Sequence, residues 1–170
     1  SGAAVEFDPD NDPSTPETLT IDATRITHPE APYDLVKKMR ASFYMLGALL
    51  GRCGKARVSL PGGCAWGPRP VALHMKGMEA LGATLTLDKG YVVAEAPGGR
   101  LHGAEITFEP SSVGATINVM LAAVRAEGTT VLHNAAAEPD VVVFGQMLQA
   151  MGAQIGGLGT TTVTIERVAT

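Results

Sequence analysis

Two stretches of the chain repeat each other, and this repeat decides the fold. Residues 71–83 read VALHMKGMEALGA and residues 141–153 read VVVFGQMLQAMGA, at a constant offset of 70 residues. Each stretch has the apolar spacing of a short amphipathic helix, and each contains a late glycine that can cap the helix before a strand begins. The repeat therefore predicts two copies of one α/β unit.

The repeat extends on both sides of these helices. Residues 55–60 and 128–133 match as strands at an offset of 73, which predicts three additional residues in the first copy, within 61–70. The remaining expected elements are longer apolar helices at 32–52 and 113–126 and strands at 19–22, 83–87, 91–96, 104–108, 153–155 and 161–165. Each unit thus has the order βαβαββ, which is typical of an α/β domain. We expect the two units to pack together with their helices inward.

Composition narrows the class of protein. The chain has 170 residues, 45% of them hydrophobic, which suffices for one sizeable core. Its net charge is -4 and it has no basic run, so we expect no nucleic acid partner. We also expect no membrane partner and a cytoplasmic location, because no apolar stretch is long enough to span a bilayer and no signal pattern is present. Two cysteines provide no disulfide framework.

The first 18 residues are acidic and interrupted by prolines. We interpret them as a loop behind an expression scar at Ser1-Gly2, with no role in the fold. The domain is expected to begin at residue 19.

The loop 61–70, PGGCAWGPRP, contains the first candidate site residues. Glycines and prolines flank Cys64, and a thiol close to Arg69 can have a lowered pKa and react as a thiolate on a mobile lid. The alternative is a surface turn with an incidental thiol. Cys53 ends an apolar helix, and we expect it to be an inert core residue.

A second candidate lies where a strand meets a helix, in EPSSVGAT at 109–116. Ser111 or Ser112 can cap the helix, and the backbone N–H groups that follow can bind an anion at the positive end of the helix dipole. The alternative is an ordinary capped helix. Arg40 is either a solvated side chain or a cation that lines a cleft.

Several motifs, in the same order, resemble the family of UDP-N-acetylglucosamine 1-carboxyvinyltransferases, enolpyruvyl transferases that open peptidoglycan synthesis. These motifs are at 31–36, 39–42, 61–64, 67–71, 73–74, 112–116, 126–130, 134–136 and 138–139. The resemblance implies an inside-out α/β barrel whose catalytic domain has three such units and faces a second domain. This chain would hold two units, about 19–100 and about 101–168. It would then be a fragment, or one part of a split enzyme, with the remaining segments as partners.

The resemblance also implies roles for individual residues. Cys64, Arg69 and Arg40 would be catalytic: Cys64 would add to phosphoenolpyruvate, assist proton transfer or product release, and be alkylated by fosfomycin. The UDP-sugar would be held by Arg69, Pro70, Val71, Leu73, Ser112, Val113 and Gly114. No metal and no cofactor are implied. The chain departs from the family pattern at Ala72, where Asp is frequent, and at Pro110, where Lys is frequent.

The implied function is transfer of the enolpyruvyl group of phosphoenolpyruvate to the 3-hydroxyl of UDP-N-acetylglucosamine, with the isolated chain inactive. This role would link the protein to cell wall biogenesis, cell shape, the cell cycle and cell division. One alternative is a shikimate-type enolpyruvyl transferase, which shares the fold but lacks the Gly-Gly-Cys loop around Cys64. The other is a non-catalytic structural or binding piece of the same fold.

Overall fold

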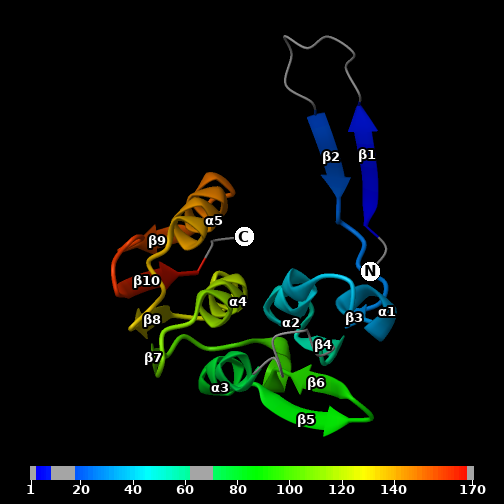
Figure 1. Ribbon diagram of the computed structural model, residues 1–170, viewed down its shortest axis with the longest axis horizontal. Helices are drawn as coiled ribbons and strands as arrows, with labels where there is room; N and C mark the ends of the chain where they lie inside the picture. Colours follow the sequence, from blue (N-terminus) through cyan, green and yellow to red (C-terminus); the bar gives the residue numbers. More distant parts are fainter. Residues whose placement is uncertain (1–2, 9–17, 62–70, 168–170) are drawn as a thin grey trace.

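The computed structural model describes residues 3–8, 18–61 and 71–167 (Figure 1). The first unit consists of β3 (Glu30–Ala31), α1 (Tyr33–Val36), the 3-10 helix η1 (Arg40–Tyr44), α2 (Met45–Cys53), β4 (Lys55–Ser59), α3 (Ala72–Ala80), β5 (Thr84–Asp88) and β6 (Tyr91–Glu95). A short 3-10 turn, η2 (Pro97–Gly99), leads to the second unit. That unit consists of β7 (Glu105–Thr107), α4 (Val113–Ala123), β8 (Thr129–His133), α5 (Pro139–Ala150), β9 (Gln154–Gly156) and β10 (Thr162–Glu166).

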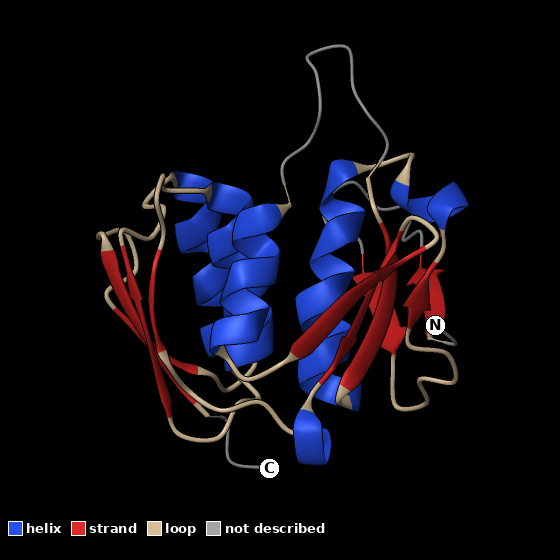
Figure 2. Cartoon of the chain, turned by 90° about the horizontal axis from the view of Figure 1, so that it is seen from below, coloured by secondary structure: helices blue, strands red, loops and turns tan. Residues whose placement is uncertain are grey.

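The two units have the same sheet topology. Their strand orders are β3-β4-β6-β5 and β7-β8-β10-β9, and in each sheet the leading strand is parallel to its neighbour while the other pairs are antiparallel. The two four-stranded sheets lie on opposite sides of the molecule, with the longer helices α2, α3, α4 and α5 between them and the short helix α1 at the outer edge (Figures 1 and 2). The predicted βαβαββ repeat and the inward packing of its helices are confirmed.

Glycines allow the helices of the two units to approach closely. A Cβ atom added to Gly47 in α2 would lie 2.1 Å from the backbone oxygen of Asn118 in α4. A Cβ atom added to Gly77 in α3 would lie 2.3 Å from a methyl group of Val119. Both distances are far shorter than a van der Waals contact, so a larger residue would push the helices apart. The centre of the molecule is therefore a close helix–helix contact surrounded by aliphatic side chains.

The strand offset of 73 is wrong by one residue. Ala56 and Val58 are buried in β4, and Thr130 and Leu132 are buried in β8, which makes the offset 74. Side chains of a strand alternate between its two faces, so a slip of one residue exchanges the buried and exposed sets. The first unit accordingly has four additional residues between strand and helix, within the predicted segment.

The interpretation of residues 1–18 as a loop is also wrong in part. Ala4–Asp8 forms β1, which pairs antiparallel with β2 (Thr18–Asp22) in a separate two-stranded sheet. The predicted strand 19–22 therefore exists but does not begin the first four-stranded sheet, because β3 occupies that place. Four apolar residues face one another across the ribbon and are 55–61% exposed: Val5, Phe7, Leu19 and Ile21.

The predicted helix 32–52 is broken into α1, η1 and α2. Met39 interrupts it, with an extended backbone at φ -145° and ψ 126°. The predicted helix 113–126 forms as α4, which ends three residues earlier than expected. No helix in the part of the chain that the structure describes is long and apolar enough to cross a membrane.

Candidate functional site

The described candidate residues gather at the N-terminal ends of α3 and α4. Val71 is the residue before α3 and Leu73 lies in its first turn. Ser112, Val113 and Gly114 begin α4 in the same way. Three of the predicted residues, Cys64, Arg69 and Pro70, lie outside the described residues, whereas Arg40 is the first residue of η1.

Ser112 is the cap of α4, one of the two predicted alternatives. Its backbone is extended, and its hydroxyl oxygen accepts a hydrogen bond from the N–H of Ala115 at 3.3 Å. Its carbonyl accepts from the N–H of Thr116 at 2.9 Å. The N–H groups of Val113 and Gly114 come before these two amides, at the positive end of the helix dipole. The geometry therefore suits the predicted anion-binding role of this turn.

His74 connects the starts of the two helices. It lies in the first turn of α3, and a Cβ atom added to Gly114 would be 3.2 Å from both Cε1 and Nε2 of its ring. Only a residue without a side chain fits at position 114 without displacing the imidazole. His74 belongs to the motif 73–74 but was not predicted as a site residue, because its contact with α4 depends on tertiary packing.

Two aromatic residues of the first unit lie against the same imidazole. The ring of Phe43 meets it edge to face, with centroids 5.2 Å apart. The ring of Tyr44 is roughly parallel to it, with centroids 6.5 Å apart. Both residues belong to η1, whose first residue is Arg40. The C-terminal end of η1 is therefore in contact with His74. The structure thus brings α3, α4 and η1 together around one buried ring.

Asn118 lies behind His74 and is fully buried in α4. Its Nδ2 lies 2.9 Å from Nδ1 of His74 and donates to the carbonyl of Phe43 at 3.2 Å. Its Oδ1 accepts from the N–H of Gly47 at 2.8 Å. This side chain is therefore the centre of a polar network that ties η1, α2 and α3 to α4. Asn118 was not predicted as a site residue, since a single asparagine in an apolar helix forms no motif.

Cys53, the cysteine expected to be inert, ends α2 half-buried and packs against the core. The two departures from the family pattern, Ala72 and Pro110, are both exposed near the helix starts. Among the residues that the structure describes, no group of three or more His, Cys, Asp or Glu side chains could hold a metal ion.

Comparisons with known proteins give consistent results. The sequence profile of the EPSP synthase (3-phosphoshikimate 1-carboxyvinyltransferase) family matches residues 13–169. The UDP-N-acetylglucosamine 1-carboxyvinyltransferase of Chlorobaculum parvum is 56% identical over 98% of this chain and 38% of its own length. The protein of the same name from Chlorobium luteolum is 60% identical over 87% of this chain and 35% of its own length. The chain therefore spans between 35% and 38% of the length of these curated relatives.

Solved structures support the same fold. The enolpyruvyl transferase NikO from Streptomyces tendae matches 98% of this chain and 37% of its own, with a TM-score of 0.75 and 29% identity. An EPSP synthase from Acinetobacter baumannii matches 99% of this chain and 37% of its own, with a TM-score of 0.67 and 20% identity. The second likeness shows the fold alone. The expectation of an enolpyruvyl transferase-like α/β fold is confirmed.

Proposed function

The chain belongs to the EPSP synthase (3-phosphoshikimate 1-carboxyvinyltransferase) family, and from this premise we propose that it is part of a UDP-N-acetylglucosamine 1-carboxyvinyltransferase. The observation that carries the proposal is sequence identity. Relatives of that name are 56% and 60% identical over most of the chain, whereas the EPSP synthase structure is 20% identical. The proposed reaction transfers the enolpyruvyl group of phosphoenolpyruvate to the 3-hydroxyl of UDP-N-acetylglucosamine, in peptidoglycan synthesis.

The reaction sets requirements that the candidate residues meet. A proton adds to the methylene carbon of phosphoenolpyruvate, and the sugar 3-oxygen bonds to C2 as it loses its proton. The tetrahedral adduct then loses phosphate and a methyl proton, which restores the double bond. An acid is needed near the methylene carbon and cations near the phosphate. We assign Cys64 to the proton transfer, and Arg69 and Arg40 to stabilising the negative charge of the phosphate. We also propose Cys64 as the thiol that fosfomycin alkylates.

The starts of α3 and α4 are proposed to bind the UDP-sugar. The N–H groups of Val113 and Gly114, behind the Ser112 cap, would meet the diphosphate, because they lie at the positive end of the α4 dipole. The uridine would lie against the residues that precede and begin α3. Those residues are Pro70, Val71 and Leu73, of which the last two are half-buried.

The remaining segments of the enzyme are proposed as partners, since α5 has an apolar face that is open. Val143, Met147 and Met151 are 64%, 47% and 72% exposed. At the offset of 70 they correspond to Leu73, Gly77 and Leu81. On α3, that face includes the contact of Gly77 with α4 and the fully buried Leu81. The stripe on α5 is therefore the counterpart of a surface that is covered within the chain.

The complementary face is open on α2. An apolar groove of about 360 Å³ there is lined by residues including Ala41, Met45 and Ala48. At the offset of 74 their counterparts on α4 are Ala115, Val119 and Ala122, all fully buried, with Val119 in contact with α3. Both halves of one helix–helix interface are thus open at once. We propose that another α/β unit of the whole enzyme covers them, and that the isolated chain is inactive.

Phosphate release from phosphoenolpyruvate and UDP-N-acetylglucosamine tests the proposal. We expect none from the isolated chain and release on addition of the remaining segments in trans. Cys64→Ala should abolish the restored activity, and Cys53→Ala, the matched control, should leave it intact. Activity of the chain without any supplement would contradict the partner proposal. Activity with shikimate 3-phosphate in place of the UDP-sugar would instead support the shikimate-type alternative.

Failure to bind UDP-N-acetylglucosamine in isothermal titration, with or without the added segments, would favour a non-catalytic piece of the same fold. The proposal includes a cytoplasmic location, because phosphoenolpyruvate and UDP-sugars are cytoplasmic metabolites. It also includes the links to cell shape and cell division that follow from a step in peptidoglycan synthesis.

A further inference from the structure

We infer that Asn118 is a positioning residue, which holds His74 as a neutral imidazole with its proton on Nε2. Asn118 is fully buried within the apolar helix α4, and a buried polar side chain requires partners. Its partners are two backbone groups and one imidazole nitrogen. Together they determine where the proton of the ring must be.

The two backbone groups fix the orientation of the amide. The N–H of Gly47 can only donate, so the atom 2.8 Å away must be the amide oxygen. The carbonyl of Phe43 can only accept, so the atom 3.2 Å away must be the amide nitrogen. Turning the amide over would place donor against donor and acceptor against acceptor. The orientation of Asn118 therefore follows from chemistry and does not depend on an arbitrary choice of atom names.

The fixed amide then determines the state of His74. Its Nδ2 group lies 2.9 Å from Nδ1 of the ring and has only hydrogens to offer, so Nδ1 must accept. An accepting Nδ1 carries no proton, which leaves the proton of the neutral ring on Nε2. A ring turned over by 180° would keep its packing against Phe43 and Tyr44 but would place Cδ2 opposite the Asn118 amide, which would leave a buried N–H without an acceptor.

The consequence concerns the first turn of α4. Nε2 is the ring nitrogen close to Gly114, so the tautomer adds an N–H donor beside the N–H groups that begin the helix. This part of the inference rests on the proposed function, in which a diphosphate binds there. The tautomer itself does not, because it follows from the three hydrogen bonds of Asn118. Asn118 acts through His74 and does not touch the proposed substrate.

Ring nitrogen NMR of the ¹⁵N-labelled chain at neutral pH tests the inference directly. We expect His74, assigned by loss of its signals in His74→Gln, to show a pyridine-type Nδ1 and a pyrrole-type Nε2. Asn118→Asp has the same shape but offers an acceptor to Nδ1, so the proton should move to Nδ1 or the ring should become doubly protonated. The matched control is Thr116→Val on the same buried helix, which should keep the wild-type pattern. A wild-type ring with its proton on Nδ1, or an unchanged pattern in Asn118→Asp, would overturn the inference.

Asn118→Ala provides a second test if the aspartate variant does not fold. It removes the constraint without a charge, so both tautomers should appear, and a pure Nε2–H ring would contradict the role of Asn118. Titration with UDP-N-acetylglucosamine separates this inference from the proposed function. Where the NMR shows that the proton of Asn118→Asp has moved to Nδ1, this variant should weaken binding by about tenfold or more, the value of one hydrogen bond to a charged group, and Thr116→Val should not. If the wild-type chain shows the expected tautomer but binds no UDP-N-acetylglucosamine even with the remaining segments added, the proposed function fails and the tautomer assignment stands.

Discussion

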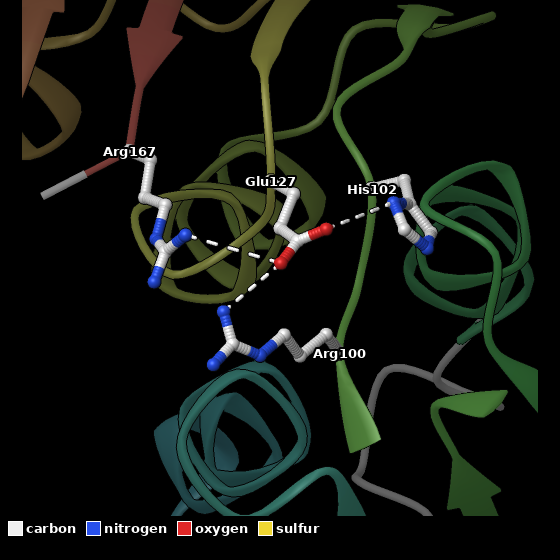
Figure 3. A network of polar contacts seen from close by, with 4 residues as sticks. All are labelled: Arg100, His102, Glu127 and Arg167. Atoms are coloured by element: carbon white, nitrogen blue, oxygen red, sulfur yellow. Dashed lines mark hydrogen bonds and ion pairs between the residues drawn. The ribbon is translucent and has the colours of Figure 1, made fainter. Parts of the chain in front are cut away.

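Two polar networks join distant segments of this chain, and they do so under opposite conditions. Around Asn118, the partners are neutral groups in the buried contact between the helices. Around Glu127, the partners are cationic or titratable side chains (Figure 3), and all of them are exposed to solvent. The Glu127 carboxylate lies 2.9 Å from Arg100, 3.9 Å from Arg167 and 3.8 Å from His102.

Water determines what each network can contribute. The side chains around Glu127 are 38–65% exposed, so water and salt compete for every contact. Backbone bonds join the same segments: the N–H of Glu127 donates to Leu101, and its carbonyl accepts from Gly103. The groups around Asn118 have no such substitute. A network of neutral groups can therefore matter more for stability than one with several charges.

The largest effect is expected when the helices are forced apart at the buried network. In Gly47→Ala the new Cβ would meet the backbone oxygen of Asn118 at 2.1 Å and its Oδ1 at 2.6 Å. We expect the free energy of unfolding, measured with urea, to fall by about 3 kcal/mol or more, since backbone atoms cannot move aside cheaply. Gly156→Ala is the matched control: its Cβ meets nothing within 4 Å, so the change should stay within about 0.5 kcal/mol. Similar losses in both variants would show that the close contact is not what matters.

A smaller but still large effect is expected when the network loses its central side chain. Asn118→Leu leaves the N–H of Gly47 and the carbonyl of Phe43 buried without their partner. We expect a loss of about 2–3 kcal/mol in the urea measurement. Thr116→Val removes the acceptor of only one buried N–H, that of Ala136, and should cost about 1–2 kcal/mol. A leucine variant as stable as the wild type would mean that the network only orients His74.

The exposed network should respond weakly, and its response should depend on salt. Glu127→Gln keeps the shape of the side chain and removes its charge, so the ion pairs with Arg100 and Arg167 are lost. We expect the free energy of unfolding to fall by about 1 kcal/mol or less at low salt, and the difference to vanish near 1 M salt. The loss in Asn118→Leu should not change with salt. A salt-independent loss in Glu127→Gln would show that the contacts of Glu127 are shielded from solvent, as those of Asn118 are.

The same contrast explains how much of the molecule the sequence predicts. The βαβαββ unit and the Ser112 cap depend on apolar spacing and capping residues within a few positions, which a sequence displays. The register of β4 against β8 depends on which face each strand buries, and neither sequence segment decides between neighbouring offsets. The strand β1 was not predicted, because it is only five residues long and an acidic segment rich in prolines separates it from its partner β2.

The site follows the same rule. Val71, Leu73, Ser112, Val113 and Gly114 were predicted from motifs, and the structure brings them to adjacent helix ends. The contact between His74 and Asn118 joins residues 44 positions apart. Each is a single polar residue in an apolar helix, and only the packing of α3 on α4 makes them a pair. Sequence patterns therefore predict local capping groups well and partners that meet through packing poorly.

The smallest expected effect concerns a carboxylate that is more exposed than Glu127. Asp22, at the end of β2, accepts a hydrogen bond at 2.9 Å from the backbone N–H of Thr24. That bond, followed by a second from the Thr24 side chain, lowers the pKa of Asp22 below the ordinary value of 3.8. A carboxyl whose pKa is lowered in the folded state adds stability above its unfolded pKa, and this stability is lost as the pH falls through the folded pKa. NMR titration of the carboxyl carbon should give a midpoint below 3.8, and Thr24→Ala should raise it only in part, because the backbone N–H remains. A midpoint at or above 3.8 would show that water has displaced the hydrogen bond between Asp22 and the Thr24 N–H. Even a short backbone contact at this exposed end of the β1–β2 sheet would then be as weak as the ion pairs of Glu127.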